Sequence, residues 1–194
     1  MKDVCYASLF DKKDLPYIYR LAEEIRTTHN QDLVNDFNNK LENKWNDHNH
    51  FLQVGNKDIE IQQVSKADDL VVTAGVNQCI DQILGTSVTR WQYMAKGIGT
   101  TTPVAGNTAL FAEQSPRVDM STSGWREYAG SSLRFAGIHG ETMPTITINE
   151  CGVFTASGGG IMLNRNVFSN FPLTHTINID GIVLSTVVEF VPVM

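Results

Sequence analysis

The residues best suited to chemistry in this sequence are two pairs of opposite charge. Glu113 and Arg117 stand four residues apart, and Glu150 and Arg165 flank a predicted hairpin. Glutamates can act together as general acid and base, but spacing along the chain assigns no two of them to the separation that a glycosidase needs. An exposed ion pair contributes only about 0.3–0.5 kcal/mol. In a region with few charges we expect both pairs to be partly buried, where they set strand register or subunit contacts.

A glycine-rich segment over residues 97–103 superficially matches a phosphate-binding loop. Gly97 and Gly99 are followed by three threonines, so Thr102 occupies the position of the last glycine, and no Gly-Lys-Ser/Thr follows. Pro103 also argues against a helix that begins there to hold a pyrophosphate. We interpret the segment as a turn between two elements.

Metal and nucleophile chemistry has little support. His48 and His50 follow Asp47 closely enough for a loose metal site, but no second cluster matches them, so a solvated helix end is preferred. His139 and His175 stand alone and are expected on the surface of a turn or strand. No Gly-x-Ser-x-Gly motif marks a nucleophile. We therefore predict a protein that is not an enzyme, with no catalytic residue, cofactor or metal.

The composition narrows the possible partners. The chain has 194 residues, with 15 Lys and Arg against 21 Asp and Glu and a net charge of −6. This balance argues against nucleic acid and membranes as partners, and no run approaches the roughly 20 apolar residues of a membrane span. The charged N-terminal residues do not resemble a secretory signal, so synthesis in a cytoplasm is expected. Three cysteines without CxxC spacing are interpreted as buried thiols: Cys5, Cys79 and Cys151.

Charge and glycine change sharply near residue 70. Residues 1–69 hold 22 of the 36 charged residues but only one of the 15 glycines. Apolar residues at helical spacing predict two helices there, over about residues 14–25 and Gln31–Asn46. The stripes consist of Ile18, Leu21, Ala22 and Ile25 in the first helix and Val34, Phe37, Leu41 and Trp45 in the second. We predict that residues 1–69 form a helical N-terminal attachment region.

Residues 70–194 are expected to form a helix and a β domain. A third helix that packs on this domain is predicted by Val72, Val76, Ile80, Ile83 and Leu84. From residue 90 the period changes to two, which predicts six or seven strands and an α+β fold with an antiparallel, jelly-roll-like β-sandwich. In the last predicted strand, residues 176–193, the apolar phase changes at Gly181, which predicts a β-bulge or a passage between sheets.

The order of these segments resembles a pattern in structural proteins of tailed bacteriophages and related archaeal viruses. The pattern has a helix like residues 72–78, a strand ending in 97–103, then segments 107–117, 148–154 and 161–168, and a long last strand. The resemblance covers about residues 70–194. It implies a β-sandwich component of a tail, a fibre or a capsid decoration, with a role in assembly and no catalytic residues.

The composition of the β domain also favours a role in assembly. Few charges and a very apolar last strand would leave apolar or edge surface exposed unless a closed symmetric oligomer covered it. We expect a virion protein that forms a homo-oligomer, with a trimer favoured, and contacts other virion proteins through residues 1–69. The structural or interface candidates are Gly97, Gly99, Glu113, Arg117, Glu150, Arg165 and Gly181.

The alternative is a carbohydrate-binding β-sandwich that recognises a host receptor. Trp91, Trp125 and Tyr128, together with Tyr93, would then provide stacking surfaces for sugar rings. The same aromatic side chains also suit a core or an interface, and packing is the preferred interpretation. The two functions are compatible in a receptor-binding fibre.

Overall fold

Helices and antiparallel sheets are combined in a computed structural model, which describes residues 2–46, 51–68, 70–129, 131–140, 142–168 and 173–189. This arrangement confirms the α+β class. The metal-site candidates His48 and His50 and the end of the last predicted strand, residues 190–193, lie outside the described residues.

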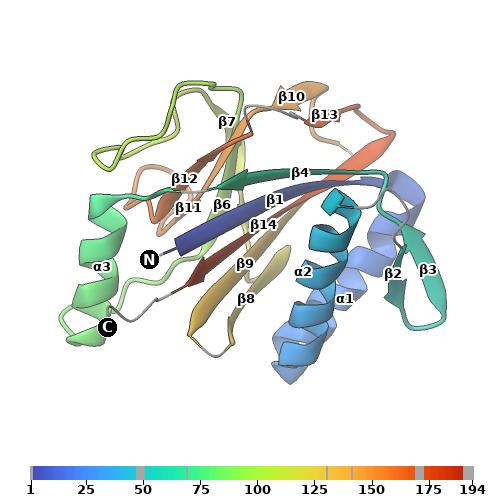
Figure 1. The fold of residues 1–194 in the computed structure, drawn as a ribbon, viewed down its shortest axis with the longest axis horizontal. Helices are drawn as coiled ribbons and strands as arrows, with labels where there is room; N and C mark the ends of the chain where they lie inside the picture. Colours follow the sequence, from blue (N-terminus) through green and yellow to red (C-terminus); the bar gives the residue numbers. More distant parts are fainter. Residues whose placement is uncertain are drawn as a thin grey trace.

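Two five-stranded sheets contain most of the described strands (Figure 1). The first has the order β4 (Gln63–Asp68), β1 (Lys2–Asp11), β14 (Asp180–Glu189), β9 (Ser132–His139) and β8 (Gly124–Ala129). The second has the order β5 (Leu70–Val71), β12 (Asn164–Val167), β11 (Glu150–Phe154), β6 (Tyr93–Gly97) and β7 (Glu113–Asp119). Two short pairs join β10 (Ile146–Ile148) with β13 (Leu173–His175) and β2 (Phe51–Val54) with β3 (Lys57–Glu60).

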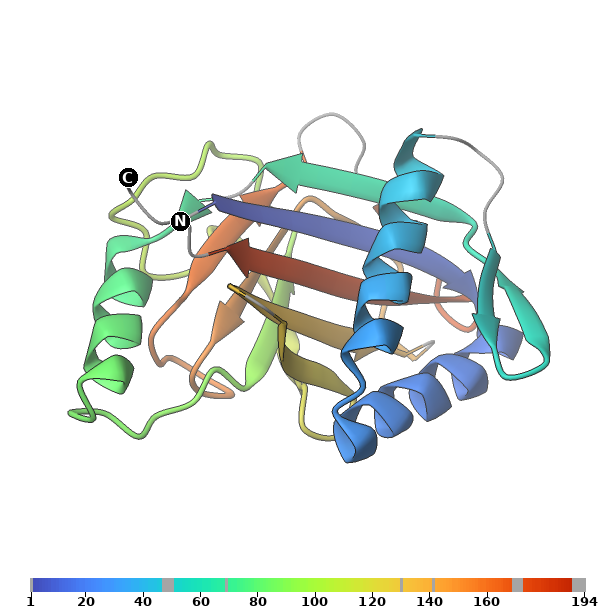
Figure 2. The ribbon, with the colours of Figure 1, turned by 60° about the horizontal axis from the view of Figure 1, so that its bottom comes forward.

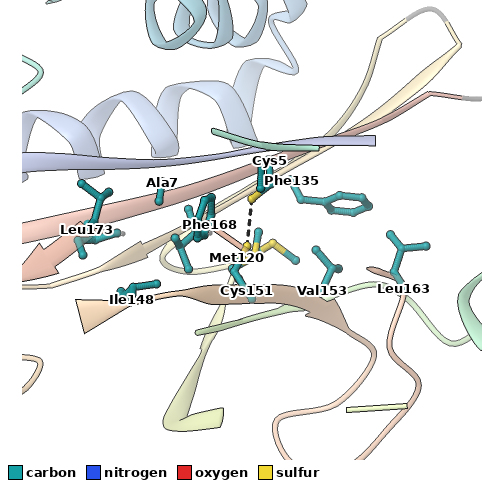
Figure 3. Packing of buried hydrophobic residues seen from close by; sticks show 14 of the residues in the cluster. Cys5, Ala7, Met120, Phe135, Ile148, Cys151, Val153, Leu163, Phe168 and Leu173 are labelled. Carbon is teal, nitrogen blue, oxygen red and sulfur yellow. Dashed lines mark hydrogen bonds between the residues drawn. The ribbon is translucent and has the colours of Figure 1, made fainter. Parts of the chain in front are cut away.

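One hydrophobic core lies between the two large sheets. Cys5 and Phe135 contribute to it from the first sheet, and Cys151 and Val153 contribute from the second (Figure 3). Successive side chains of a strand point to opposite faces of the sheet. Every second residue of β1 and β14 therefore points away from this core, toward the other face of the first sheet.

A second core fills that other side, where α1 (Leu15–Thr28) and α2 (Gln31–Asn46) cover the first sheet (Figure 2). Phe10 and Val183 meet the apolar stripes of both helices there. The two predicted helices are thus confirmed, with seven of their eight stripe residues buried and Trp45 partly buried.

The prediction that residues 1–69 are helical needs correction, because this part of the chain also contains strands. β1 comes before the two helices in the sequence, and β2, β3 and β4 come after them. β1 pairs with β14 along its full length, from Lys2 opposite Glu189 to Asp11 opposite Asp180, and with β4 on its other edge. Both faces of β1 are buried, so its sequence lacks the alternation of polar and apolar residues by which strands are recognised. Residues 1–69 therefore share a sheet with the C-terminal part of the chain.

The prediction of a β-bulge at Gly181 is wrong, since the register of β14 against β1 runs without a shift through the pair Phe10–Gly181. The apparent phase change arises because Ile177 and Ile179 lie in an exposed turn before the strand begins. A side chain at Gly181 would collide with Leu15, so glycine here lets the first turn of α1 lie directly on the sheet.

The third helix, α3 (Thr73–Ile83), is present, but it packs differently from the prediction. Its buried residues are Gly75, Gln78 and Cys79. Of the five expected contact residues, Val72 is buried and Val76 is half-buried, whereas Ile80, Ile83 and Leu84 are exposed. None of the described helices has the length and apolarity needed to cross a lipid bilayer.

Candidate functional site

The ion pair between Glu150 and Arg165 is the most enclosed charged feature among the described residues. Glu150 is at the start of β11 and Arg165 is on the neighbouring β12, and both side chains are buried. Arg165 donates from Nε to Oε2 of Glu150 at 2.8 Å, and its Nη2 lies 2.8 Å from the same oxygen. A pair removed from water in this way is stable only if its other hydrogen-bonding groups also find partners.

The carboxylate of Glu150 finds those partners at the two ends of the segment 98–112. Its Oε1 accepts hydrogen bonds from the backbone N–H of Gly99 at 3.2 Å and of Ala112 at 2.7 Å. Its Oε2 accepts a further bond from the backbone N–H of Phe111 at 3.1 Å. One buried side chain therefore holds the beginning and the end of this segment together; we call residues 98–112 the β6–β7 loop.

Arg165 binds the middle of the same loop. Its Nη2 donates to Oγ1 of Thr101 at 2.9 Å, and its Nη1 donates to Oδ1 of Asn107 at 3.3 Å. The same oxygen of Asn107 accepts from the backbone N–H of Val104, at 2.9 Å. The ion pair thus fixes the loop at both ends and at two internal points.

The two glycines of the segment leave room for the carboxylate. A side chain at Gly97 or Gly99 would place its Cβ 2.6 Å or 2.5 Å from Oε1 of Glu150. The sequence prediction that these glycines are structural agrees with this geometry. Among the described residues they surround a glutamate, and a negatively charged group at this position would repel a phosphate.

Glu113 and Arg117 form the second ion pair, on β7. Arg117 donates from Nε to Oε1 of Glu113 at 2.6 Å and from Nη2 to Oε2 at 2.8 Å. Its Nη1 donates to the carbonyl oxygens of Ala156 and Gly159, at 2.7 and 2.6 Å, and its guanidinium stacks 3.6 Å from the ring centre of Phe154. This pair therefore orders the glycine-rich turn after β11.

A bulge allows residues four apart in a strand to meet. Val118 pairs with Met94 and Gln114 pairs with Lys96, so four residues of β7 advance while β6 advances by two. The extra residues shorten β7 locally and bring the side chains of Glu113 and Arg117 together.

Lys96, which the sequence prediction did not consider, and His139, which it expected at the surface, are both buried titratable residues. Lys96 donates to the carbonyl oxygens of Gln114 and Pro116, at 3.2 and 3.1 Å, and burial lowers its pKa to about 8 against the opposing effect of Glu113. Burial, together with the positive charges of Lys96 and His175, holds the pKa of His139 well below its ordinary value. Four successive residues of β6, from Met94 to Gly97, are buried, so no alternation of polar and apolar residues in the sequence marked Lys96 as buried.

The isolated histidines were expected at the surface, and both are instead buried. The ring nitrogens of His175 lie 3.2 Å from the carbonyl oxygen of Pro144 and 2.7 Å from that of Asp180. Both therefore contact the backbone of neighbouring segments. Among the described residues, no three His, Cys, Asp or Glu side chains are arranged to hold a metal ion.

The aromatic candidates for sugar stacking divide into buried and exposed residues. Trp125 is fully buried and meets Phe37 edge to face, with ring centres 4.9 Å apart, and Trp91 is also buried. Tyr128 is 59% exposed and borders a groove of about 380 Å³ together with Arg90 and Arg126. Of the three candidates, only Tyr128 is exposed.

Apolar side chains are exposed on two neighbouring elements. The loop patch consists of Ile98, Val104 and Phe111 of the β6–β7 loop, and the α3 patch consists of Ile80, Ile83, Leu84 and Val88. Phe111 is 71% exposed and Ile83 is 78% exposed. A backbone hydrogen bond from Thr73 to Ala105 joins the loop to the start of α3, and both elements lie at the same end of the molecule (Figures 1 and 2).

Comparisons of this chain with protein-family models, curated proteins and solved structures find no match. The function must therefore be argued from the residues themselves.

Proposed function

We propose that this protein is a non-enzymatic structural component of a virion, in a tail, a fibre or a capsid decoration. In this proposal the two facing sheets form a jelly-roll-like sandwich, and the chain assembles as a homo-oligomer, with a trimer favoured. The resemblance of residues 70–194 to structural proteins of tailed bacteriophages and archaeal viruses motivates the virion role.

The observation that carries the proposal is the use of Glu150 and Arg165 to order the β6–β7 loop. Both charges are enclosed, and their hydrogen bonds go to loop backbone and side chains. Such groups shape a surface and do not face a substrate. The segments of the resemblance at 97–103, 107–117, 148–154 and 161–168 all contribute to this network or to that of Arg117.

The surface shaped by this network favours contact with protein. The ordered loop exposes the loop patch, and α3 beside it exposes the α3 patch. Apolar area costs about 25 cal/mol per Å² when it stays in water, so covering it stabilises an assembly. A closed symmetric oligomer covers such a surface on every subunit with one kind of contact.

Residues 1–69 remain the proposed contact to other virion proteins. Their apolar stripes are already buried against the first sheet, so this contact would use the outer, polar faces of α1 and α2 and the β2–β3 hairpin. A groove of about 590 Å³ between α1 and the β2–β3 hairpin is bordered by Tyr17, Arg20 and Lys57.

The oligomer is tested by measuring the mass of the purified chain with light scattering at micromolar concentration. We expect a trimer for the wild type and a monomer for Ile83→Asp, because a buried charge opposes assembly. Ile179→Asp is the matched control, since Ile179 is exposed but lies outside both patches. A stable wild-type monomer would contradict the oligomer, and a protein found in the host cell but never in purified particles would contradict the virion role.

Tyr128 keeps the carbohydrate-binding alternative open, because its exposed ring borders a groove with two arginines. The test is binding to a glycan array by the wild type and by Tyr128→Ala. Binding that is lost in this variant, with the oligomeric state unchanged, would favour the alternative. Trp125→Ala is unsuitable for this test, since Trp125 belongs to the core under α2.

A further inference from the structure

Two cysteines from opposite sheets meet in the core. Cys5 on β1 and Cys151 on β11 are both fully buried, and their Sγ atoms lie 3.0 Å apart (Figure 3). The two residues are 146 positions apart in the sequence. The sequence prediction of buried thiols did not anticipate that they face each other.

The contact joins the interior strands of both sheets. β1 lies between β4 and β14, and β11 lies between β12 and β6. Cys5 is opposite Thr186 in the first sheet, and Cys151 is opposite Lys96 in the second. A covalent link at this point would therefore connect the two layers away from their edges.

We propose that Cys5 and Cys151 form a disulfide that cross-links the two sheets when the chain folds in the presence of a small-molecule disulfide. The sulfur atoms must approach by about 1 Å, because an S–S bond is about 2.05 Å long. Reducing cytoplasm keeps such thiols reduced, whereas an oxidising environment outside the cell lets the bond persist. The cross-link does not depend on the proposed virion role.

The reaction is a double thiol–disulfide exchange. The thiolate of one cysteine attacks a small disulfide such as oxidised glutathione, which breaks its S–S bond, forms a mixed disulfide and releases one thiolate. The thiolate of the second cysteine then attacks the first cysteine's sulfur and releases the other small thiolate. The two cysteines are oxidised, the reagent is reduced to two thiols, and these thiols take up the two protons.

Burial decides when this reaction occurs. Both sulfurs are enclosed by the core, so the reagent reaches them while the chain is folding or when the two sheets separate. Once formed, the bond closes a very long loop and restricts the unfolded chain. We expect the cross-linked protein to melt about 5–15 °C above the reduced protein.

The experiment refolds the full chain from denaturant with reduced and oxidised glutathione, in parallel with a sample in dithiothreitol. Remaining thiols are then alkylated, and the intact mass, the peptide map and the melting temperature are measured. We expect one alkylated residue, Cys79, a linked peptide containing Cys5 and Cys151, and the higher melting temperature. Dithiothreitol added under denaturing conditions should restore three alkylated cysteines.

The variants separate this pair from general cysteine oxidation. The Cys79→Ser variant should still form the cross-link between Cys5 and Cys151. The variants Cys151→Ser and Cys5→Ala should not form it, because each lacks one of the two sulfur atoms. Three alkylated cysteines in oxidised, natively folded wild type would overturn the proposal. A cross-link that uses Cys79, or one that lowers the melting temperature, would overturn it as well.

Discussion

Glu150 and Glu113 are both paired with arginine, but their surroundings differ. Glu150 is 0% exposed and Glu113 is 26% exposed. The carboxylate of Glu150 accepts from three backbone N–H groups as well as from Arg165, whereas Arg117 keeps two backbone carbonyl partners of its own. A change of charge should therefore have very different effects at the two glutamates.

Glu150→Gln should lower the free energy of unfolding by about 3–5 kcal/mol, as is usual when one member of a buried pair is removed. The amide would leave Arg165 without a counter-charge. Its NH₂ group would also face the backbone N–H groups and the guanidinium that now donate to the carboxylate. Glu113→Gln is the matched control and should cost about 1 kcal/mol or less. Urea unfolding at neutral pH measures both values, and equal losses would contradict the contrast.

Because burial lowers the pKa of Lys96, we expect the free energy of unfolding to rise with pH above about pH 8. Below about pH 8 it is charged in the folded and unfolded chain, so its full burial cost is present. Between about 8 and 10.5 the folded chain has lost the proton and the unfolded chain retains it, so the stability of the wild type rises relative to a variant without this lysine. The rise should be about 2–3 kcal/mol between pH 7 and pH 10.

Lys96→Met supplies the comparison, because ionisation elsewhere in the chain is shared by the two proteins. Unfolding free energies of both are measured in urea at pH 7 and pH 10. The advantage of the methionine variant should shrink by the stated amount as the pH rises. A difference that stays constant would show that Lys96 titrates normally in the folded chain.

At the scale of elements, α3 depends on a close approach that only glycine allows. A Cβ at Gly75 would lie 2.7 Å from the Cα atom of Leu163, so the helix or the neighbouring backbone would have to move. Gly75→Ala should therefore destabilise the protein by about 1–3 kcal/mol, even though alanine favours an isolated helix by about 1 kcal/mol.

Gly106→Ala is the control for this prediction. Gly106 has open space around its Cα atom and does not adopt a positive φ, so alanine should change the stability little. Urea unfolding compares the two variants. A Gly75→Ala variant as stable as the wild type would mean that α3 can move away from the backbone of Leu163 at little cost in free energy.

The elements that the sequence predicts well are those with one buried face. α1 and α2 show a helical stripe because their other side faces solvent. The sequence did not reveal β1 because both of its faces are covered. The start of β14 was misjudged because a turn with exposed isoleucines precedes the strand.

The site shows the same limit, since the sequence identified its charged residues but not their partners. The sequence prediction paired Glu150 with Arg165 and gave Gly97 and Gly99 a structural role, but it did not connect the glycines with the carboxylate that they contact. Their hydrogen bonds to the β6–β7 loop join residues 38–64 positions apart, and the contact between Cys5 and Cys151 spans 146. Local periodicity contains no information about contacts between residues that are so far apart in the sequence.

At the scale of the molecule, the first sheet links the two parts that composition separates. β1 and β4 come from residues 1–69, and β14, β9 and β8 come from the remainder. β1 lies against β14 over ten residue pairs, and α1 and α2 cover the outer face of the same sheet. A fragment of residues 70–194 would expose an unpaired strand edge and a large apolar face.

We therefore predict that residues 70–194 do not fold alone, although the virion role is proposed from this part of the sequence. The isolated fragment should lack near-ultraviolet circular dichroism and a cooperative thermal transition, because the apolar burial that offsets chain entropy is lost. Mixing it with an equimolar fragment of residues 1–69 should restore both signals, since the two parts complete one sheet. Cooperative melting of the fragment alone, within a few degrees of the whole chain, would instead show that the N-terminal part is a separable attachment region.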